Sequence, residues 1–372
     1  MLKAEMGVRS LQVRHAVAVA IAMAMPLPAA WAQDTTLDPV MVTAQRRTEN
    51  VQDVPVAIST LDNEKLNILG SGGDDIRLLS GRVPSLLIES SFGRAFPRFY
   101  IRGLGNTDFD LNASQPVSLI YDDVVQENPI LKGFPVFDLE MVEVFRGPQG
   151  TLFGRNTPAG VVKFNSVRPS REMGGYFQAS YGEDATVNLE GAVGGPLGKN
   201  WSMRLSAMYQ HRDDWVDNYE PDGDLIEKNA FEGYDEAAGR LQFLYEPSED
   251  FSALINIHAR TLDGTARMFR ANVFELGSQG LVSGFDEDVV SYDGSNDQDL
   301  DSSGGSLRIS KNFGNVTLHT ITGYETVDVL SRGDIDGGYS CAFAPCTAPS
   351  GPGFIPFTAE SADGLSDHDQ LT

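Results

Sequence analysis

From about residue 174 onward, apolar and polar residues alternate, and this pattern constrains the fold more than any other feature of the chain. In one run, for example, Trp201, Met203 and Leu205 alternate with polar neighbours. A period of two places alternate side chains on opposite faces of a β-sheet. The pattern predicts about seven strands, at residues 176–181, 187–193, 201–210, 240–245, 251–258, 307–313 and 316–324.

The connections between these runs also alternate, in length. Short turns lie at residues 194–200, 246–250 and 312–315, and long connections lie at residues 211–236, 262–304 and 329–372. A soluble sandwich of two sheets has strands of the same kind. Short turns at one end and long loops at the other are, however, typical of a transmembrane antiparallel β-barrel. We expect such a barrel, with only about seven strands present, and keep the soluble sandwich as the alternative.

The charge of the chain bears on its partners. The sequence has 52 Asp and Glu residues against 28 Lys and Arg residues, a formal net charge of −24. Nucleic acid is not an expected partner, because binding phosphate requires a basic face. The three long connections together hold 25 acidic and 5 basic residues, so the acidity is concentrated in the predicted outer loops. We hypothesise that divalent cations bridge these loops to the lipid of an outer membrane.

The first 32 residues have the features of a secretory signal peptide. Lys3, Arg9 and Arg14 precede an apolar run at residues 16–25, and Ala30-Trp31-Ala32 fits a small-x-small cleavage site. The apolar run is too short to span about 30 Å of hydrocarbon. We therefore expect residues 1–32 to be removed on export.

Residues between about 45 and 169 have a mixed pattern of short elements. Strands are expected at residues 55–59, 85–88, 99–102, 117–125 and 142–145, and helices at residues 63–69 and 74–79. Asp74 is the expected cap of the second helix, and Gly81 its stop. A compact α+β domain of this size can form its own core.

The strongest local signal lies at the end of this domain, where residues 138–156 read DLEMVEVFRGPQGTLFGRN. This run resembles the end of the plug domain of TonB-dependent outer-membrane receptors. Ile101-Arg102-Gly103 and residues 117–124 resemble earlier parts of the same plug, in the family's order. The segment Asp38, Pro39, Val40, Met41, Val42, Thr43 and Ala44 is similar to the family's TonB box.

The resemblance extends from about residue 37 to the last residue and implies four parts. These are a signal peptide (1–32), an N-terminal segment with the box (33–46), a plug (47–170) and a partial barrel with long extracellular loops (174–372). The implied function is energy-coupled uptake of a scarce solute across the outer membrane. An iron chelate such as a ferric siderophore is the expected ligand, and the periplasmic protein TonB the expected partner.

Two other interpretations stay open. One is a passive porin or an adhesin-like barrel. The other is a truncated fragment that does not transport, because the family barrel has 22 strands and the pattern here accounts for about seven.

The resemblance also identifies candidate site residues. The box is a β-prone segment that could add as a strand to a partner's sheet edge. The plug motif residues are Arg102, Gly103, Glu140, Glu143, Arg146, Gly147, Pro148, Gly150, Gly154 and Arg155. In the family, such arginines and glutamates look like part of a lock between plug and barrel wall. Ordinary structural ion pairs within the plug are the alternative.

No pattern of catalytic residues is found. The sequence has no His-Glu-x-x-His, no Gly-x-Ser-x-Gly and no Walker loop, and its five histidines are scattered. We expect no enzyme activity, no cofactor and no dedicated metal site. Asp293, Ser295, Asp297 and Asp299 match only part of a calcium loop. Cys341 and Cys346 are expected to form a small loop disulfide, since an exported chain meets an oxidising compartment.

Overall fold

The computed structural model describes residues 40–43, 49–70, 72, 75–108, 110–220, 223–266, 268–275, 277–340, 354–355 and 361–372. The predicted signal peptide, the box residues Asp38, Pro39 and Ala44, and the pair Cys341 and Cys346 lie outside these residues. Residues 41–372 form one compact unit. Within the described part of the chain, no helix is both long and apolar enough to cross a bilayer.

The domain predicted to be the plug, called the plug below, is built on a five-stranded sheet with the order β3-β8-β9-β6-β7. Its strands are β3 (Ile58–Asp62), β6 (Val117–Tyr121), β7 (Val124–Gln126), β8 (Leu139–Arg146) and β9 (Gly160–Ser166). β6 and β9 are parallel, and the other neighbours are antiparallel. β6 is buried along its whole length, which agrees with the run of apolar residues at its position.

Shorter elements surround this sheet. They are β1 (Met41–Val42) paired with β2 (Glu49–Asn50), β4 (Leu86–Glu89) paired with β5 (Arg98–Ile101), and the helices α2 (Asn63–Gly70), η1 (Ile76–Leu79), η2 (Ile130–Gly133) and α3 (Gly150–Phe153). The main core of the plug includes Leu79, Phe99, Val142, Val162 and Phe164.

Two local predictions in the plug differ from the structure. The second helix is a single 3-10 turn, and its cap is Asp75, whose carboxylate accepts from the Arg77 N–H at 2.9 Å. The expected strand at residues 117–125 is a hairpin, because the chain turns at Asp122 and Asp123. Both residues have positive φ, 47° and 71°, as a two-residue type I′ turn requires. Aspartate tolerates this conformation, so the turn needs no glycine.

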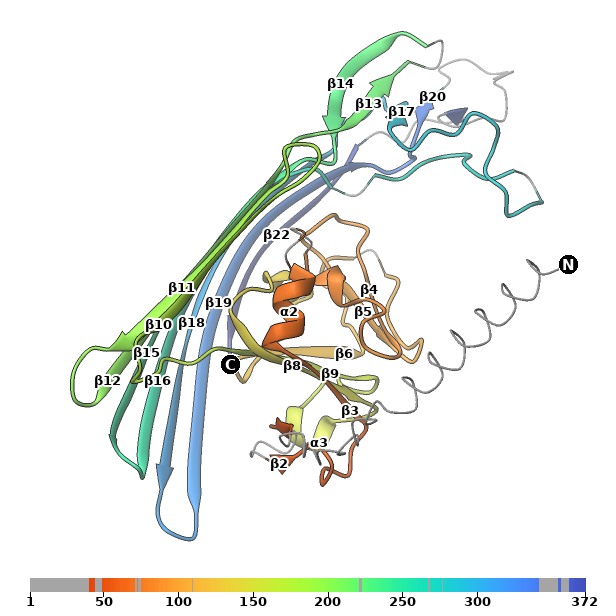
Figure 1. Ribbon diagram of the computed structural model, residues 1–372. Coiled ribbons are helices and arrows are strands. Elements are labelled where there is room, and N and C mark those ends of the chain that lie inside the picture. The colour runs from red at the N-terminus through yellow and green to blue at the C-terminus, as the bar shows by residue number, and fades with distance from the viewer. Residues whose placement is uncertain are drawn as a thin grey trace, which may run out of the picture. The chain divides into compact units, whose positions relative to one another are not determined.

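The second half of the chain forms an eight-stranded sheet with the order β10-β11-β12-β15-β16-β18-β19-β22 (Figure 1). The strands are β10 (Gly174–Tyr181), β11 (Val187–Pro196), β12 (Trp201–Arg212), β15 (Tyr234–Ser248), β16 (Phe251–Gly264), β18 (Asp297–Asn312), β19 (Thr317–Asp334) and β22 (Ser361–Leu371). Every neighbouring pair is antiparallel. β10 and β22 are the edges, so the sheet is not closed. The predicted partial antiparallel barrel is confirmed.

The two faces of this sheet are inverted relative to those of a soluble protein. Large apolar side chains point outward, and Val193 and Ile257 are more than half exposed. The polar residues that alternate with them, such as Arg240, Gln242 and Asn256, are buried on the opposite face. A soluble sandwich would bury the apolar face instead. An apolar outer face and a polar inner face are the pattern of a membrane barrel.

The strands are longer than the alternation predicted. β18 has 16 residues and β19 has 18, whereas about 9–11 residues span a bilayer. The expected long loops are therefore partly strand. The first of them also holds β13 (Val216–Tyr219) and β14 (Leu225–Phe231), which form a small sheet with β17 (Val289–Val290) from the second. β20 (Tyr339–Ser340) and β21 (Phe354–Ile355) form a further short pair.

Candidate functional site

The plug is joined to the polar face of the sheet by buried charges. Arg94, in the connection between β4 and β5, donates from Nε to Oε2 of Glu236 on β15 at 2.6 Å. Arg260 on β16 donates to the other oxygen of Glu236 at 2.8 Å. All three side chains are buried. Burial lowers the pKa of Arg94, but the carboxylates of Glu236 and Asp75 outweigh it and raise the pKa above its usual value.

The backbone around Arg94 fits the sheet closely. The Arg94 N–H donates to Oε1 of Gln298 at 3.2 Å, and Arg260 Nη2 donates to the Arg94 carbonyl at 3.2 Å. Gly93 has φ +61°, and a Cβ there would lie 2.9 Å from both Gln298 Oε1 and the Thr265 carbonyl. Only glycine combines this backbone conformation with so close an approach. The connection between β4 and β5 is thus held against the eight-stranded sheet, called the wall below, by backbone and side-chain contacts.

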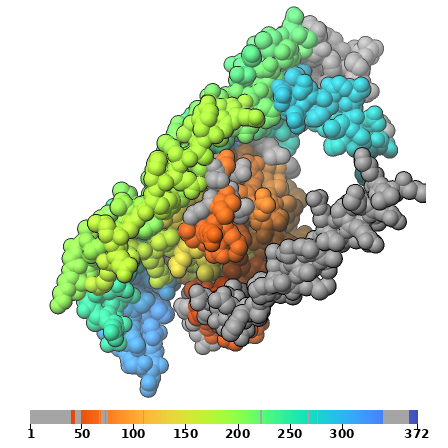
Figure 2. Space-filling model, viewed as in Figure 1, coloured from red at the N-terminus to blue at the C-terminus, as the bar shows by residue number. Residues whose placement is uncertain are grey.

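Apolar contacts accompany these charges. One buried cluster takes Ala95, Phe96, Leu111, Ile130 and Leu131 from the plug and Leu262, Leu300, Val327 and Val329 from the sheet. In the space-filling view, the orange plug residues lie directly against the green strands (Figure 2). The plug is therefore packed against the sheet and not merely tethered to it.

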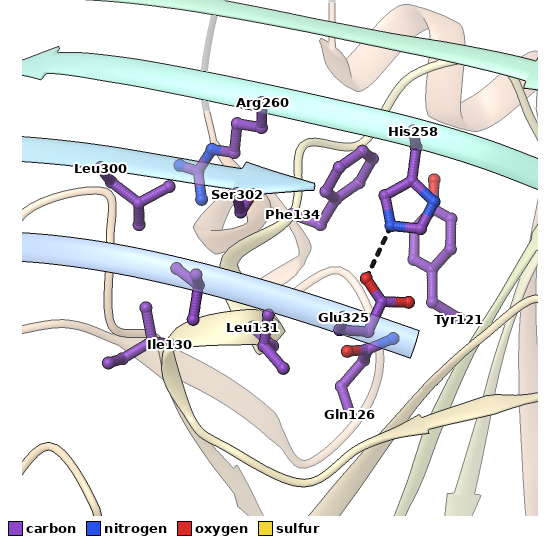
Figure 3. A pocket seen from close by; sticks show the side chains of 11 residues that line it. Tyr121, Gln126, Ile130, Leu131, Phe134, His258, Arg260, Leu300, Ser302 and Glu325 are labelled. Atoms are coloured by element: carbon purple, nitrogen blue, oxygen red, sulfur yellow. Dashed lines mark hydrogen bonds and ion pairs between the residues drawn. The ribbon is translucent and has the colours of Figure 1, made fainter. Parts of the chain in front are cut away.

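A small pocket between plug and sheet contains a buried contact between a histidine and a glutamate (Figure 3). His258 Nε2 on β16 lies 2.8 Å from Glu325 Oε2 on β19. The Phe134 ring of the plug meets the imidazole edge to face, with ring centroids 5.0 Å apart. Tyr121 also lies beside the imidazole, with ring centroids 6.4 Å apart (Figure 3). This pair packs against aromatic plug residues, which ties the middle of the plug to two strands.

A second group of contacts lies near β8. Arg204 on β12 donates to both carboxylate oxygens of Asp138, at 2.8 and 2.5 Å. Arg240 on β15 donates to the Phe137 carbonyl at 2.9 Å and to the Tyr121 hydroxyl at 2.8 Å. Bidentate arginine pairs of this kind fix orientation as well as position.

Most of the predicted plug motif residues make their contacts with other plug residues, and not with the eight-stranded sheet. Arg155 pairs with Glu127 of the plug at 2.8 Å, and its side chain is mostly exposed. Arg146 donates to the Ile58 carbonyl at 3.4 Å, and Glu140 is exposed. Arg102 and Gly103 are exposed with positive φ. Gly147, Pro148, Gly150 and Gly154 form the turns around α3, where Gly147 and Gly154 also have positive φ.

The described part of the predicted box is held on the plug. Val42 is almost fully buried, in a cluster that also contains Phe145, Phe153 and Val161. The Thr43 N–H and hydroxyl donate to the two oxygens of Glu143 at 2.5 and 2.6 Å. The structure thus brings one predicted plug residue, Glu143, together with one predicted box residue.

A polar cavity of about 370 Å³ lies where the plug meets the ends of β12, β15 and β16. Its lining includes Arg77, Arg94, Arg212 and Tyr234. The Arg94 guanidinium also lies over the Tyr234 ring, 4.0 Å from its centroid. Although burial raises the pKa of Asp75 in this lining, Arg94 and Arg77 hold it below its usual value. Two carboxylates, Asp75 and Glu232, line the cavity beside these arginines, and Asp75 pairs with Arg77 at 2.8 Å.

Among the described residues, one group of acidic side chains has a spacing suited to a metal ion. Oxygens of Asp293, Asp334 and Asp336 lie within 4.8 Å of one another. Of the four residues that match part of a calcium loop in the sequence, only Asp293 belongs to this group.

The wall contacts were not found from the sequence. Arg94 and Glu236 are 142 residues apart, so no local motif marks them. A usable signal was present on the polar face of the strands, where Arg204, Glu236 and Arg240 place ionisable side chains.

Comparisons with known proteins agree with this geometry. Residues 50–161 match the family model described as "TonB-dependent Receptor Plug Domain". The pesticin receptor of Yersinia enterocolitica is 26% identical over 115 residues, which are 31% of this chain and 17% of that receptor.

Solved structures share the fold. The ferric yersiniabactin uptake receptor FyuA from Yersinia pestis superposes with a TM-score of 0.61 at 17% identity, over 74% of this chain and 42% of that one. The ferric-catecholate import receptor Fiu from E. coli K12 gives 0.63 at 16% identity, over 90% and 48%. The chain thus spans less than half the length of these receptors. Residues 50–161 thus match the plug domain of TonB-dependent receptors, and the sheet that follows shares the fold of part of the barrel in these solved receptors.

Proposed function

We propose that the protein takes up a scarce solute across the outer membrane, with energy supplied through TonB. The observation that carries this proposal is the plug fixed to the polar face of the sheet through Arg94, Glu236 and Arg260. A passive pore does not need a domain that packs against the polar face of its wall. A receptor whose plug moves when it is pulled needs such a domain, and the solute passes through without undergoing a reaction.

The solute we propose is a ferric siderophore or a similar iron chelate. FyuA and Fiu are named as receptors for ferric yersiniabactin uptake and ferric-catecholate import. The cavity lined by Arg77, Arg94 and Arg212 supports an anionic ligand, because guanidinium groups bind carboxylate and similar oxygens through paired donors.

Residues 38–44 are the proposed binding segment for TonB. Met41 and Val42 already form a strand paired with Asn50 and Glu49. A segment that can form a strand here can also add to an exposed sheet edge of a partner, where backbone hydrogen bonds supply much of the affinity.

The test is uptake of a radiolabelled iron chelate by cells that make the protein, with and without TonB. Val42→Pro should abolish energised uptake and leave chelate binding intact, because proline removes a backbone donor from the added strand. Val42→Ile keeps a β-branched side chain and is the matched control, with uptake near the wild-type rate. Undiminished uptake by Val42→Pro would remove the box from the mechanism.

The same assay separates the alternatives. Uptake that persists without TonB and in the presence of a protonophore would favour a passive porin. Chelate binding without any uptake would favour the non-transporting fragment. An adhesin-like role would show neither binding nor uptake of the chelate.

A further inference from the structure

Two connections at the same end of the wall bring three carboxylates together. The first joins β17 to β18 and contains Asp293. The second follows β19 and contains Asp336, and Asp334 is the last residue of β19 itself. β18 and β19 are antiparallel, with Asp297 opposite Arg332, so the start of one strand lies beside the end of the other. Figure 1 shows β17 and β20 beyond this end of the sheet.

Asp334 is held in a fixed orientation although it is almost completely buried, with 1% of the residue exposed. Its Oδ2 accepts from the Gly294 N–H at 3.2 Å, and its Oδ1 accepts from the Gly337 N–H at 3.0 Å. Each carboxylate oxygen has a further lone pair, which these two bonds leave available. Among the described residues, no lysine or arginine forms an ion pair with Asp334. Buried carboxylates are normally paired or coordinate a metal ion.

Asp293 and Asp336 complete the group. Oxygens of the three carboxylates lie within 4.8 Å of one another. The Gly338 N–H donates to Oδ1 of Asp336 at 3.1 Å, which orients this carboxylate as well. Negative charges this close repel one another, and a cation among them replaces the repulsion by attraction.

Asn296 gives an independent indication of a ligand at this place. The residue is 3% exposed, and its Nδ2 donates to the Ala266 carbonyl at 3.1 Å. Its Oδ1 is buried and has no hydrogen-bond partner among the described residues. A Cβ built on Gly333 would lie 3.7 Å from this oxygen, so the amide directs its oxygen to the end of β19, next to Asp334. A buried amide oxygen without a donor is costly, and a bound cation satisfies it.

We propose that Asp293, Asp334, Asp336 and Oδ1 of Asn296 bind one Ca²⁺ ion. Carboxylate and amide oxygens are the ligands of hard cations, and no histidine or cysteine belongs to the group, which disfavours zinc. Ca²⁺ takes about six to eight oxygens in a flexible geometry, whereas Mg²⁺ usually binds one or two carboxylates and keeps several waters. The ion ties the β17–β18 connection to the end of β19. This site replaces the sequence-based expectation of no dedicated metal site, and it is independent of the proposed uptake.

The experiment is a titration of the full chain in detergent with Tb³⁺, a luminescent substitute for Ca²⁺, after a chelator has removed divalent cations. Tyr292 precedes Asp293 and is buried, so excitation of tyrosine should sensitise the bound ion. The wild-type protein should give a saturable signal that Ca²⁺ displaces at lower concentration than Mg²⁺. Asp334→Asn and Asn296→Ala should each raise the half-saturating Tb³⁺ concentration at least about tenfold, because loss of a residue that only orients a ligand already costs that much.

Asp299→Asn is the matched control. Asp299 belongs to the same acidic run in the sequence, but it is exposed on β18 and lies outside the group. Its half-saturating Tb³⁺ concentration should stay within about twofold of the wild-type value, since an exposed charge contributes little. Hydrogen–deuterium exchange without Ca²⁺ checks that β18 and β19 stay paired in each variant. The proposal is overturned if Ca²⁺ does not displace Tb³⁺, if Asp334→Asn and Asn296→Ala bind like the wild type, or if Asp299→Asn loses as much affinity, because binding would then follow overall acidity.

Discussion

Lys132 should make the stability of the plug depend on pH in an unusual direction. Its side chain lies in η2 and is 2% exposed. The ammonium group donates to the Val117 carbonyl at 2.9 Å and to Gln115 Oε1 at 3.2 Å, both neutral acceptors. Burial lowers the pKa of Lys132 to about 7, and the more distant Glu127 offsets only part of that effect.

The sign follows from proton binding. Between pH 7 and the ordinary lysine pKa of 10.5, the unfolded chain holds a proton on Lys132 that the folded chain lacks. The free energy of unfolding therefore rises with pH in this window, by up to about 1.4 kcal/mol per pH unit. From pH 7 to pH 9 the Lys132 contribution should be about 2 kcal/mol, less than twice that slope because the folded chain still holds about half a proton on Lys132 at pH 7.

Pulse proteolysis in urea, on the full chain in detergent, measures the stability of the plug at each pH. Lys132→Met should flatten the pH dependence by about 1 kcal/mol or more per pH unit. The absolute stability of this variant is not the criterion, because Val117 and Gln115 also lose a donor. Lys65→Met, at a mostly exposed lysine, should leave the slope unchanged. Equal slopes for wild type and Lys132→Met would refute a neutral buried lysine.

Two further predictions concern the plug–wall contact. Gly93→Ala should loosen the plug, measured as faster protease cleavage of the connection, because the new Cβ would meet Gln298 and the Thr265 carbonyl. Gly81→Ala carries the same positive-φ strain with open space around the Cβ and should have the smaller effect; equal effects would contradict the close-approach argument. Glu236→Gln should weaken docking by about 3–5 kcal/mol, since it removes the carboxylate that two buried arginines share. Urea titration of plug release measures this, and an unchanged midpoint would contradict it.

The strands could be predicted from the sequence where one face is apolar. β12 and β16 follow the alternation closely, and a one-residue shift would turn their apolar face towards the plug. β22 lacked this signal, since Leu365 and Leu371 are its only large apolar residues. Its backbone pairs with β19 along eleven positions, and pairing of this kind leaves no trace in composition. Eight strands were therefore found where about seven were expected.

The contacts of the candidate site also divide into those that a local sequence run indicates and those that only the tertiary structure brings together. The run around Glu143 and Arg146 could be found because a local turn and strand need those residues in sequence. Contacts such as Arg94 with Glu236 form only when the plug meets the sheet, and their spacing along the chain is arbitrary. Asp122 and Asp123 lie in a run that predicts one strand over residues 117–125. In the structure they form a turn, and their carboxylates contact Asn256 and Arg308 of the eight-stranded sheet.

The plug–wall interface contains more buried charge than stability alone requires. Replacing a buried ion pair by well-packed apolar residues is often neutral or stabilising, whereas removing one partner is costly. The apolar cluster around Phe96 and Leu300 could hold the plug without charges. The energy of a charge pair depends steeply on geometry, because a small displacement of Arg94 from Glu236 uncovers a charge that water must then solvate. Under the proposed function, such an interface holds the plug in one position at rest and gives way once a pull begins. A purely apolar interface would resist displacement more evenly, because apolar contacts are not directional.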